Sequence, residues 1–341
     1  MIRRPPRSTQ SRSSAASDVY KRQPEADKLI IDQFIMQGGR VLWFVDPVNV
    51  SIDSLSSGAS TLAFMNQHNL DDMLFRYGVR LNPLLIQDIQ CAVIPVNTAL
   101  VGQEPRFVPA PWLYYPLLIP PADNPITKGL NLIQAKFISP IDTVGMNDEV
   151  KKRILLSTSK EAKLVKIPAL INLNQVSKGI TRYEFQHSML PVAVELQGIF
   201  KSNFRNRPIN AILPNGTIKF ADKSGFTKMI VVADADIIRN DVQRRPNGAY
   251  VIPLGYDRFT QQTYGNKELV VNMVKYLCDD NGLLDLRSRD IKLRLLDRKR
   301  AISERLYWQL INMVLPSLML LVAGIMWNFV RRKKYTFTDV K

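Results

Sequence analysis

The chain has 341 residues, with 46 Lys and Arg against 30 Asp and Glu and a formal net charge of +16. This length allows two domains, or one large domain with attachments. The charge lies at the ends, because residues 1–23 and 287–341 carry net charges of +5 and +9. The nearly neutral middle does not interleave basic and aromatic residues, which argues against a nucleic-acid partner. Two Cys and two His exclude a disulfide framework and a zinc cluster, so we expect no cofactor and no metal.

Residues 1–23 are rich in Arg and Ser and contain no apolar run of signal-peptide length. Such a segment is expected to be disordered. It resembles translated sequencing adapter joined to a truncated reading frame, so we exclude it from the fold. We therefore expect the native N-terminus, with any membrane anchor that it carries, to be missing.

Residues 24–286 alternate helical and strand patterns. Leu29–Gln37 has apolar residues at helical spacing and is followed by Gly38-Gly39, after which VLWFVDP forms a short apolar run that ends at Asp46. A second apolar run leads through Met229 to Asp236. Helices are also predicted at 70–77 and 266–278, and a strand at 192–200. The pattern indicates an α/β body.

The two apolar runs are hydrophobic on both faces, which is typical of parallel strands covered by helices on each side. We therefore expect a mostly parallel, doubly wound sheet with helices on both faces, of the amidotransferase or flavodoxin-like kind. The stretch Pro105–Pro125 is rich in proline and is expected to be an extended surface loop. This loop either covers the body, which we favour, or serves as a recognition arm.

Residues 306–330 contain no charged side chain and are long enough to cross a bilayer. Trp308 and Trp327 are spaced to reach the two interfaces, and RRKK at 331–334 ends the span. We predict a transmembrane helix at 306–330, preceded by a basic stalk at 287–305 and followed by a basic tail at 331–341. The flanking charges are positive on both sides, so they leave the orientation open.

The chain lacks the motifs of several enzyme classes. It contains no G-x-x-x-x-G-K-[ST] phosphate loop, no G-x-G-x-x-G turn after a strand and no G-x-S-x-G elbow. A cysteine nucleophile would need a strand-to-helix turn, but Cys91 and Cys278 are predicted outside such turns, the latter in a helix facing the core. No catalytic residue is therefore assigned.

One group of acids could form a ligand site. Asp234 and Asp236 follow one predicted buried strand, and Asp46 follows the other. Parallel strands bring their carboxyl ends to one edge of a sheet, where ligands of such folds gather. The alternative is that these carboxylates accept hydrogen bonds from turn amides, and this is the interpretation that we favour.

Several segments of the chain resemble the GldG family, the auxiliary, substrate-binding-like component of the gliding-motility ABC transporter of Bacteroidetes-type bacteria. These segments are FIMQGGRVLWFVDP, NLDDMLFRYGVRLN, NPITKGLN, ILLSTS, PVAVELQGIFKSNFRNRP, MIVVADADIIRND and YGNKELVVNMVKYL, together with the terminal span. The resemblance covers about residues 25–335. It implies an extracytoplasmic domain anchored in the inner membrane that assembles with separate permease and ATPase subunits.

We therefore expect a non-enzymatic, membrane-anchored accessory subunit of an ABC transport complex associated with gliding motility. Its body would face the periplasm, and its residues 306–330 would contact lipid. Two alternatives remain open at this point. One is a membrane-tethered hydrolase or amidotransferase-like enzyme, and the other is a sensor of a small ligand such as a sugar or nucleotide.

Overall fold

The computed structural model describes residues 22–50, 55, 60–97, 104, 106–145, 149–177, 180–212, 219–245, 248–282, 284 and 304–335. The expectations for residues 1–21, for the basic stalk up to residue 303 and for residues 336–341 of the basic tail lie outside these ranges. The chain divides into two units, residues 1–289 and residues 290–341, and each is described by itself.

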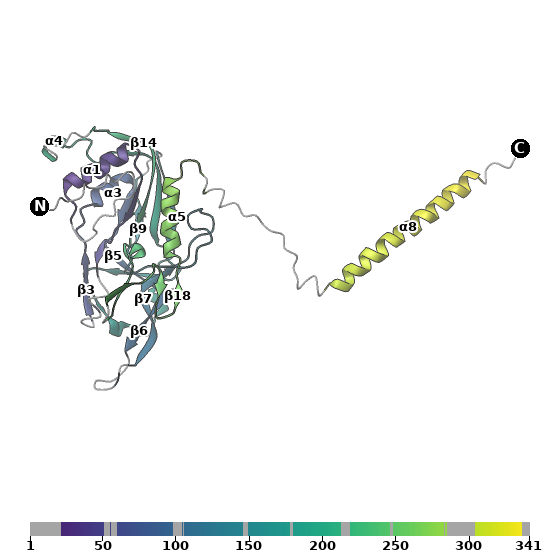
Figure 1. Cartoon of the computed structure of the whole chain (residues 1–341), viewed down its shortest axis with the longest axis horizontal. Coiled ribbons are helices and arrows are strands. Elements are labelled where there is room, and N and C mark those ends of the chain that lie inside the picture. Colours follow the sequence, from purple (N-terminus) through teal and green to yellow (C-terminus); the bar gives the residue numbers. More distant parts are fainter. Residues whose placement is uncertain are drawn as a thin grey trace. The chain divides into compact units, whose positions relative to one another are not determined.

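A four-stranded sheet forms the centre of the first unit (Figure 1). Its strands, in spatial order, are β1 (Val41–Phe44), β14 (Lys223–Val232), β13 (Pro191–Lys201) and β10 (Val150–Ser157). The β1–β14 pair is parallel, whereas β14–β13 and β13–β10 are antiparallel. The inner strands β14 and β13 are long and largely buried, so the sheet is the core of the unit.

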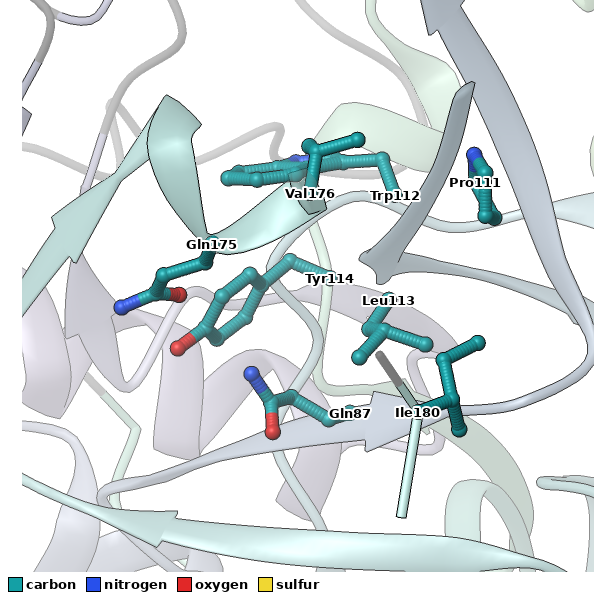
Figure 2. Close-up of a pocket in the computed structure, with 8 residues that line it drawn as sticks. All are labelled: Gln87, Pro111, Trp112, Leu113, Tyr114, Gln175, Val176 and Ile180. Atoms are coloured by element: carbon teal, nitrogen blue, oxygen red, sulfur yellow. The ribbon is translucent and has the colours of Figure 1, made fainter. Parts of the chain in front are cut away.

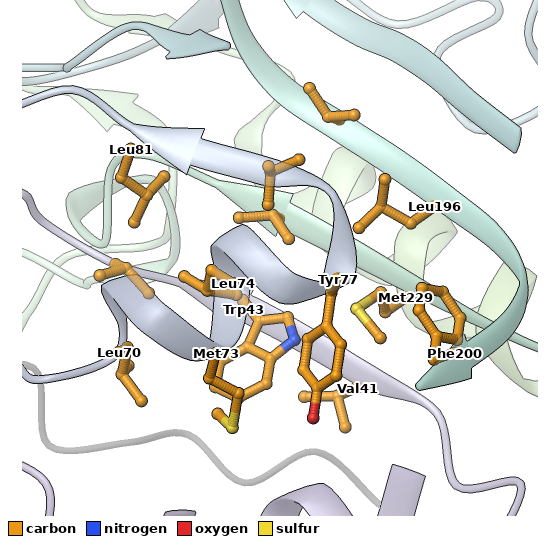
Figure 3. Close-up of a cluster of buried hydrophobic side chains, with 14 of the residues drawn as sticks. Val41, Trp43, Leu70, Met73, Leu74, Tyr77, Leu81, Leu196, Phe200 and Met229 are labelled. Carbon is orange, nitrogen blue, oxygen red and sulfur yellow. The ribbon is translucent and has the colours of Figure 1, made fainter. Parts of the chain in front are cut away.

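Helices pack on both faces of this sheet. On one face lie α1 (Glu25–Met36) and α3 (Asp71–Tyr77), and on the other lies α5 (Asn266–Cys278) (Figure 1). Figure 3 shows the first interface, where Leu74 and Tyr77 of α3 meet Trp43 of β1 and Phe200 of β13. The rings of Tyr77 and Phe200 meet edge to face, with centroids 5.7 Å apart, an arrangement that aromatic pairs prefer.

Smaller antiparallel sheets complete the unit. Their strands are β2 (Val48–Asn49), β3 (Ser60–Met65) and β12 (Ala169–Asn172); β4 (Val79–Leu81) and β9 (Ile141–Thr143); β5 (Leu84–Asp88) and β11 (Ala162–Lys166); β6 (Cys91–Asn97), β7 (Phe107–Leu118) and β8 (Ile133–Gln134); β15 (Val242–Arg245) and β16 (Gly248–Val251); and β17 (Tyr256–Asp257) and β18 (Gln262–Thr263). The short helices are α4 (Ile209–Ile212), η1 (Leu173–Ser177), η2 (Arg182–Glu184) and η3 (Asp236–Ile238).

The expected doubly wound, mostly parallel sheet is wrong. Among the described residues β1–β14 is the one parallel pair, and every other pairing is antiparallel. The error has a physical cause. The two continuous apolar runs, in β1 and β14, do pair in parallel, but the rest of the sheet does not continue this pattern, because β13 is antiparallel to both of its neighbours. A strand is buried on both faces whenever other elements pack on both sides of its sheet, whether its neighbours are parallel or antiparallel.

The expected surface loop at Pro105–Pro125 is also wrong, because most of it forms β7. Pro109 and Pro111 lie two residues apart in this strand, so both proline nitrogens face the same edge. The neighbouring strand β8 pairs only with Leu117 and Leu118, so the edge near the prolines needs no ladder donor. Proline is therefore tolerated here although β7 is an inner strand of its sheet.

The helices near the sheet agree with the sequence predictions. The α5 helix spans the predicted residues 266–278, and α3 ends at Gly78, whose φ of 115° forms a left-handed cap. The second unit contains α8 (Arg305–Tyr335), a 31-residue helix with none of its residues buried. Its length and apolar composition suffice to cross a membrane.

Candidate functional site

The three candidate aspartates come together at the carboxyl end of the parallel pair. β1 ends at Phe44 and β14 at Val232, and the backbone amide of Val45 still donates to the carbonyl of Val232 at 3.0 Å. Asp46 and Asp234 therefore follow their strands at the same level, and Asp236 begins η3. The prediction that these acids share one edge holds because this one pair of strands is parallel.

Each buried carboxylate is turned toward backbone amides. The amide of Ala235 donates to Asp46 Oδ1 at 2.6 Å. Asp234 accepts two such bonds, from the amide of Lys136 at 2.8 Å and from the amide of Asp236 at 2.7 Å. Asp234 thereby fixes the segment between β8 and β9 and the start of η3 to the end of β14.

The cluster is electrostatically strained. Burial raises the pKa of Asp46 to about 7, and the nearby charge of Asp236 adds to the rise. Burial raises the pKa of Asp234 well above its usual value, with further contributions from Asp236 and Asp46. Burial also raises the pKa of Asp236, and the positive charges of Lys136 and Arg239 partly offset this rise. Arg239 Nη1 lies 3.3 Å from Asp236 Oδ1. Protonation of one of these carboxyl groups therefore stabilises the buried cluster more than it would stabilise a cluster of exposed acids.

This geometry is suited to fastening loops. In the part of the chain that the structure describes, no group of three or more His, Cys, Asp or Glu is placed to hold a metal ion. The Asp234 oxygens are engaged by amides, and one oxygen of Asp46 is engaged as well. Capping of the two strand ends is the role for which the observed hydrogen bonds provide direct support.

The two cysteines lie outside this cluster. Cys91 begins β6 and is half-buried, and burial with help from the nearby Asp88 raises the pKa of its thiol to about 11. A thiol with such a pKa is protonated near neutral pH, which is the opposite of an activated nucleophile. Cys278 ends α5 with its side chain exposed, so the prediction that it faces the core is wrong.

A pocket that the sequence analysis missed lies against β7 (Figure 2). It is lined by residues of β5, β7, η1 and the segment after η1: Gln87, Pro111, Trp112, Leu113, Tyr114, Gln175, Val176 and Ile180. Figure 2 shows the indole of Trp112 and the amide of Gln175 on the same side as the Tyr114 ring. The alternation of Trp112 and Tyr114 was the available signal, since residues two apart on a strand share a face.

Two buried polar atoms in this pocket have no hydrogen-bond partner among the described residues, Trp112 Nε1 and Gln175 Oε1. One is a donor and the other an acceptor, and a water molecule could satisfy both. The pocket volume of about 20 Å³ fits a single water and is too small for an organic ligand. We therefore assign no ligand to this pocket.

Comparison with known proteins gives a match that covers most of the first unit. A family model described as an ABC-type uncharacterized transport system, of the auxiliary kind, matches residues 19–273. No curated protein and no solved structure matches the chain. The matched range includes the central sheet, the three aspartates and most of α5.

Proposed function

Since this chain belongs to the auxiliary family of the ABC-type uncharacterized transport system, we propose that it is a non-enzymatic subunit that joins the system's permease and ATPase at the membrane. The single observation that carries the proposal is the match over residues 19–273. An auxiliary component acts as part of a larger complex, so we propose that this chain works through contacts with the other subunits.

Membrane anchoring through α8 is part of the proposal. α8 contains one apolar stretch between Arg305 and the cations Arg331–Lys334, and a soluble unit would bury such a surface. We propose that α8 crosses the inner membrane and that the first unit lies on the periplasmic side. The resemblance to the gliding-motility family supports this orientation and an association with gliding motility.

The absence of a catalytic role is also proposed. Backbone amides engage both oxygens of Asp234 and one oxygen of Asp46, and burial suppresses ionisation of the Cys91 thiol. The alternative of a hydrolase or amidotransferase was based on a doubly wound sheet, and the strand pairings contradict that sheet. The alternative of a ligand sensor would need a site other than the pocket beside Trp112, which is too small for an organic ligand. A second pocket, of about 280 Å³ and lined by residues that include Asn131, Tyr264 and Glu268, is the place where such a ligand would fit.

Co-purification tests the proposal. The full chain, tagged and produced together with the permease and ATPase of its transport system, is solubilised in mild detergent and isolated through the tag. We expect both subunits to be retained in a fixed ratio. A matched chain without residues 304–341 should stay in the soluble fraction after cell lysis. A full chain that is repeatedly isolated alone, with both other subunits present in the membranes, would contradict the proposal.

A further inference from the structure

The α8 helix has two chemically different faces. At about 100° per residue, its amide-bearing and small side chains, with Pro316 and Ser317, fall within an arc of about 160°. These residues are Gln309, Asn312, Pro316, Ser317, Ala323, Gly324 and Asn328. The opposite face presents large apolar side chains, including Ile311, Leu318 and Ile325, with Tyr307 in its first turn. We call the first arc the polar face of α8.

Asn312 is the residue on this face whose exposure to lipid would cost the most free energy. It lies six positions from Leu318, the middle of the apolar span, which places it about 9 Å from the bilayer centre and well inside the hydrocarbon. Its side chain is exposed, and its amide has no hydrogen-bond partner among the described residues. Amide groups within a membrane-spanning helix face other protein rather than lipid, because lipid offers no hydrogen bond.

Pro316 adds a second unsatisfied group at the same depth. In an α-helix the carbonyl of Asn312 would accept from the backbone amide of residue 316, but proline has no amide hydrogen. The Ser317 hydroxyl does not fill this gap, because it donates to the carbonyl of Met313 at 2.9 Å. The backbone carbonyl and the side-chain amide of Asn312 thus both need partners at one level of the bilayer.

We propose that the polar face of α8 packs against a transmembrane helix of the permease. This helix would carry a hydroxyl or amide side chain, such as Ser, Thr, Asn or Gln, at the depth of Asn312. That side chain would donate a hydrogen bond to the backbone carbonyl of Asn312 and form a second hydrogen bond with the side-chain amide of Asn312. Ala323 and Gly324 let the partner's backbone approach closely one to two turns beyond Ser317. The inference rests on the proposed function, because the permease is the membrane-embedded subunit named there.

Charge favours the permease over a second copy of this chain as the occupant. Two copies anchored in the same orientation would bring together their Arg305 side chains at one end of α8. At the other end they would bring together two sets of Arg331, Arg332, Lys333 and Lys334. Like charges at both ends oppose such a pair, and a helix with acidic or neutral flanks avoids this cost.

The test uses the full chain in complex with the permease and ATPase, and the readout is the ratio of permease to chain after tag purification. Asn312→Leu removes the amide, and Pro316→Ala supplies the missing backbone donor to the Asn312 carbonyl. Each is expected to lower the ratio about threefold to tenfold, the range that corresponds to one interhelical hydrogen bond. Ile311→Leu, on the opposite face at the same depth, is the matched control and should leave the ratio unchanged.

A photo-crosslinking residue placed at Leu320, in the centre of the polar face, should join the chain to the permease, whereas the same probe at Leu318 should not. Normal retention of the permease by both Asn312→Leu and Pro316→Ala would overturn the inference and leave the proposed function intact. A Leu320 adduct with twice the mass of the chain would overturn it in favour of a second copy. Failure of the unaltered chain to retain the permease would instead refute the proposed function.

Discussion

At the scale of single residues, Asp46 couples the stability of the first unit to pH. Burial raises its pKa to about 7 in the folded chain, whereas the carboxyl of an unfolded chain titrates near its model value of 3.8. Between these values the folded state holds the additional proton. The free energy of unfolding is therefore expected to fall as the pH rises from about 4 to about 7, by at most about 1.4 kcal/mol per pH unit for this group.

Asp46→Asn should flatten this pH dependence. Asparagine is neutral throughout the range and keeps an oxygen for the amide of Ala235. Thermal melts at pH 4.5, 5.5, 6.5 and 7.5 measure the slope, and Asp142→Asn, at an exposed position of β9, is the control that should retain it. An unchanged slope in Asp46→Asn would show that Asp46 is ionised throughout in the folded chain.

Asp234 is expected to be the most sensitive of the three acids. Asp234→Ala leaves the amides of Lys136 and Asp236 without acceptors, and unfolding experiments in urea should show a loss of about 2 kcal/mol or more. Asp234→Asn offers one oxygen to two amides, so its loss should be smaller. A melting increase of several degrees with Mg²⁺ or Ca²⁺, abolished by Asp236→Asn, would instead establish the cluster as a ligand site.

The sequence predicted the meeting of these acids but not the pocket at Trp112. The acids directly follow two apolar runs of strand length, and these two runs form the parallel pair β1–β14. Gln175 reaches Trp112 only because η1 packs on β7, and no local pattern encodes that contact.

At the scale of elements, helix prediction succeeded where a stop signal was present. α3 ends at Gly78 with a left-handed backbone, and α5 has a clear apolar stripe. Strand direction could not be predicted, because one and the same apolar strand, β14, pairs in parallel with β1 and antiparallel with β13. The strand β7 was missed because proline normally excludes inner strands.

The β10–β13 pair gives a sharp test at the same scale. Gly198 has a φ of 148°, and a Cβ atom there would lie 2.0 Å from the carbonyl oxygen of Glu149. Gly198→Ala is therefore expected to cost about 3 kcal/mol or more, because the backbone of one strand must move.

Gly225 on β14 is the matched control, because nothing lies within 4 Å of a Cβ built there. Gly225→Ala should change the free energy of unfolding by less than about 1 kcal/mol. Urea denaturation of both variants measures the difference. Equal stability of the two variants would contradict the close approach of β13 to Glu149.

At the scale of the whole molecule, the proposed topology is open to direct test. Protease added to intact spheroplasts that contain the full chain should digest the first unit, because the proposal places it in the periplasm. A tag fused after Lys341 should stay protected until lysis. Protection of the first unit with digestion of the tag would reverse the orientation, and the flanking charges at Arg305 and Arg331 alone would permit either result.

The parallel pair β1–β14 also constrains how the chain is made. The bond between Ala235 and Asp46 joins residues 189 positions apart. At about 5 to 20 residues per second, the ribosome needs roughly 10 to 40 s to supply β14 after β1 has emerged. During this interval the apolar strand VLWF lacks its partner β14, and it is a natural binding site for chaperones. Slowing translation beyond residue 47 should therefore prolong chaperone binding and increase aggregation, whereas slowing it beyond residue 235 should not.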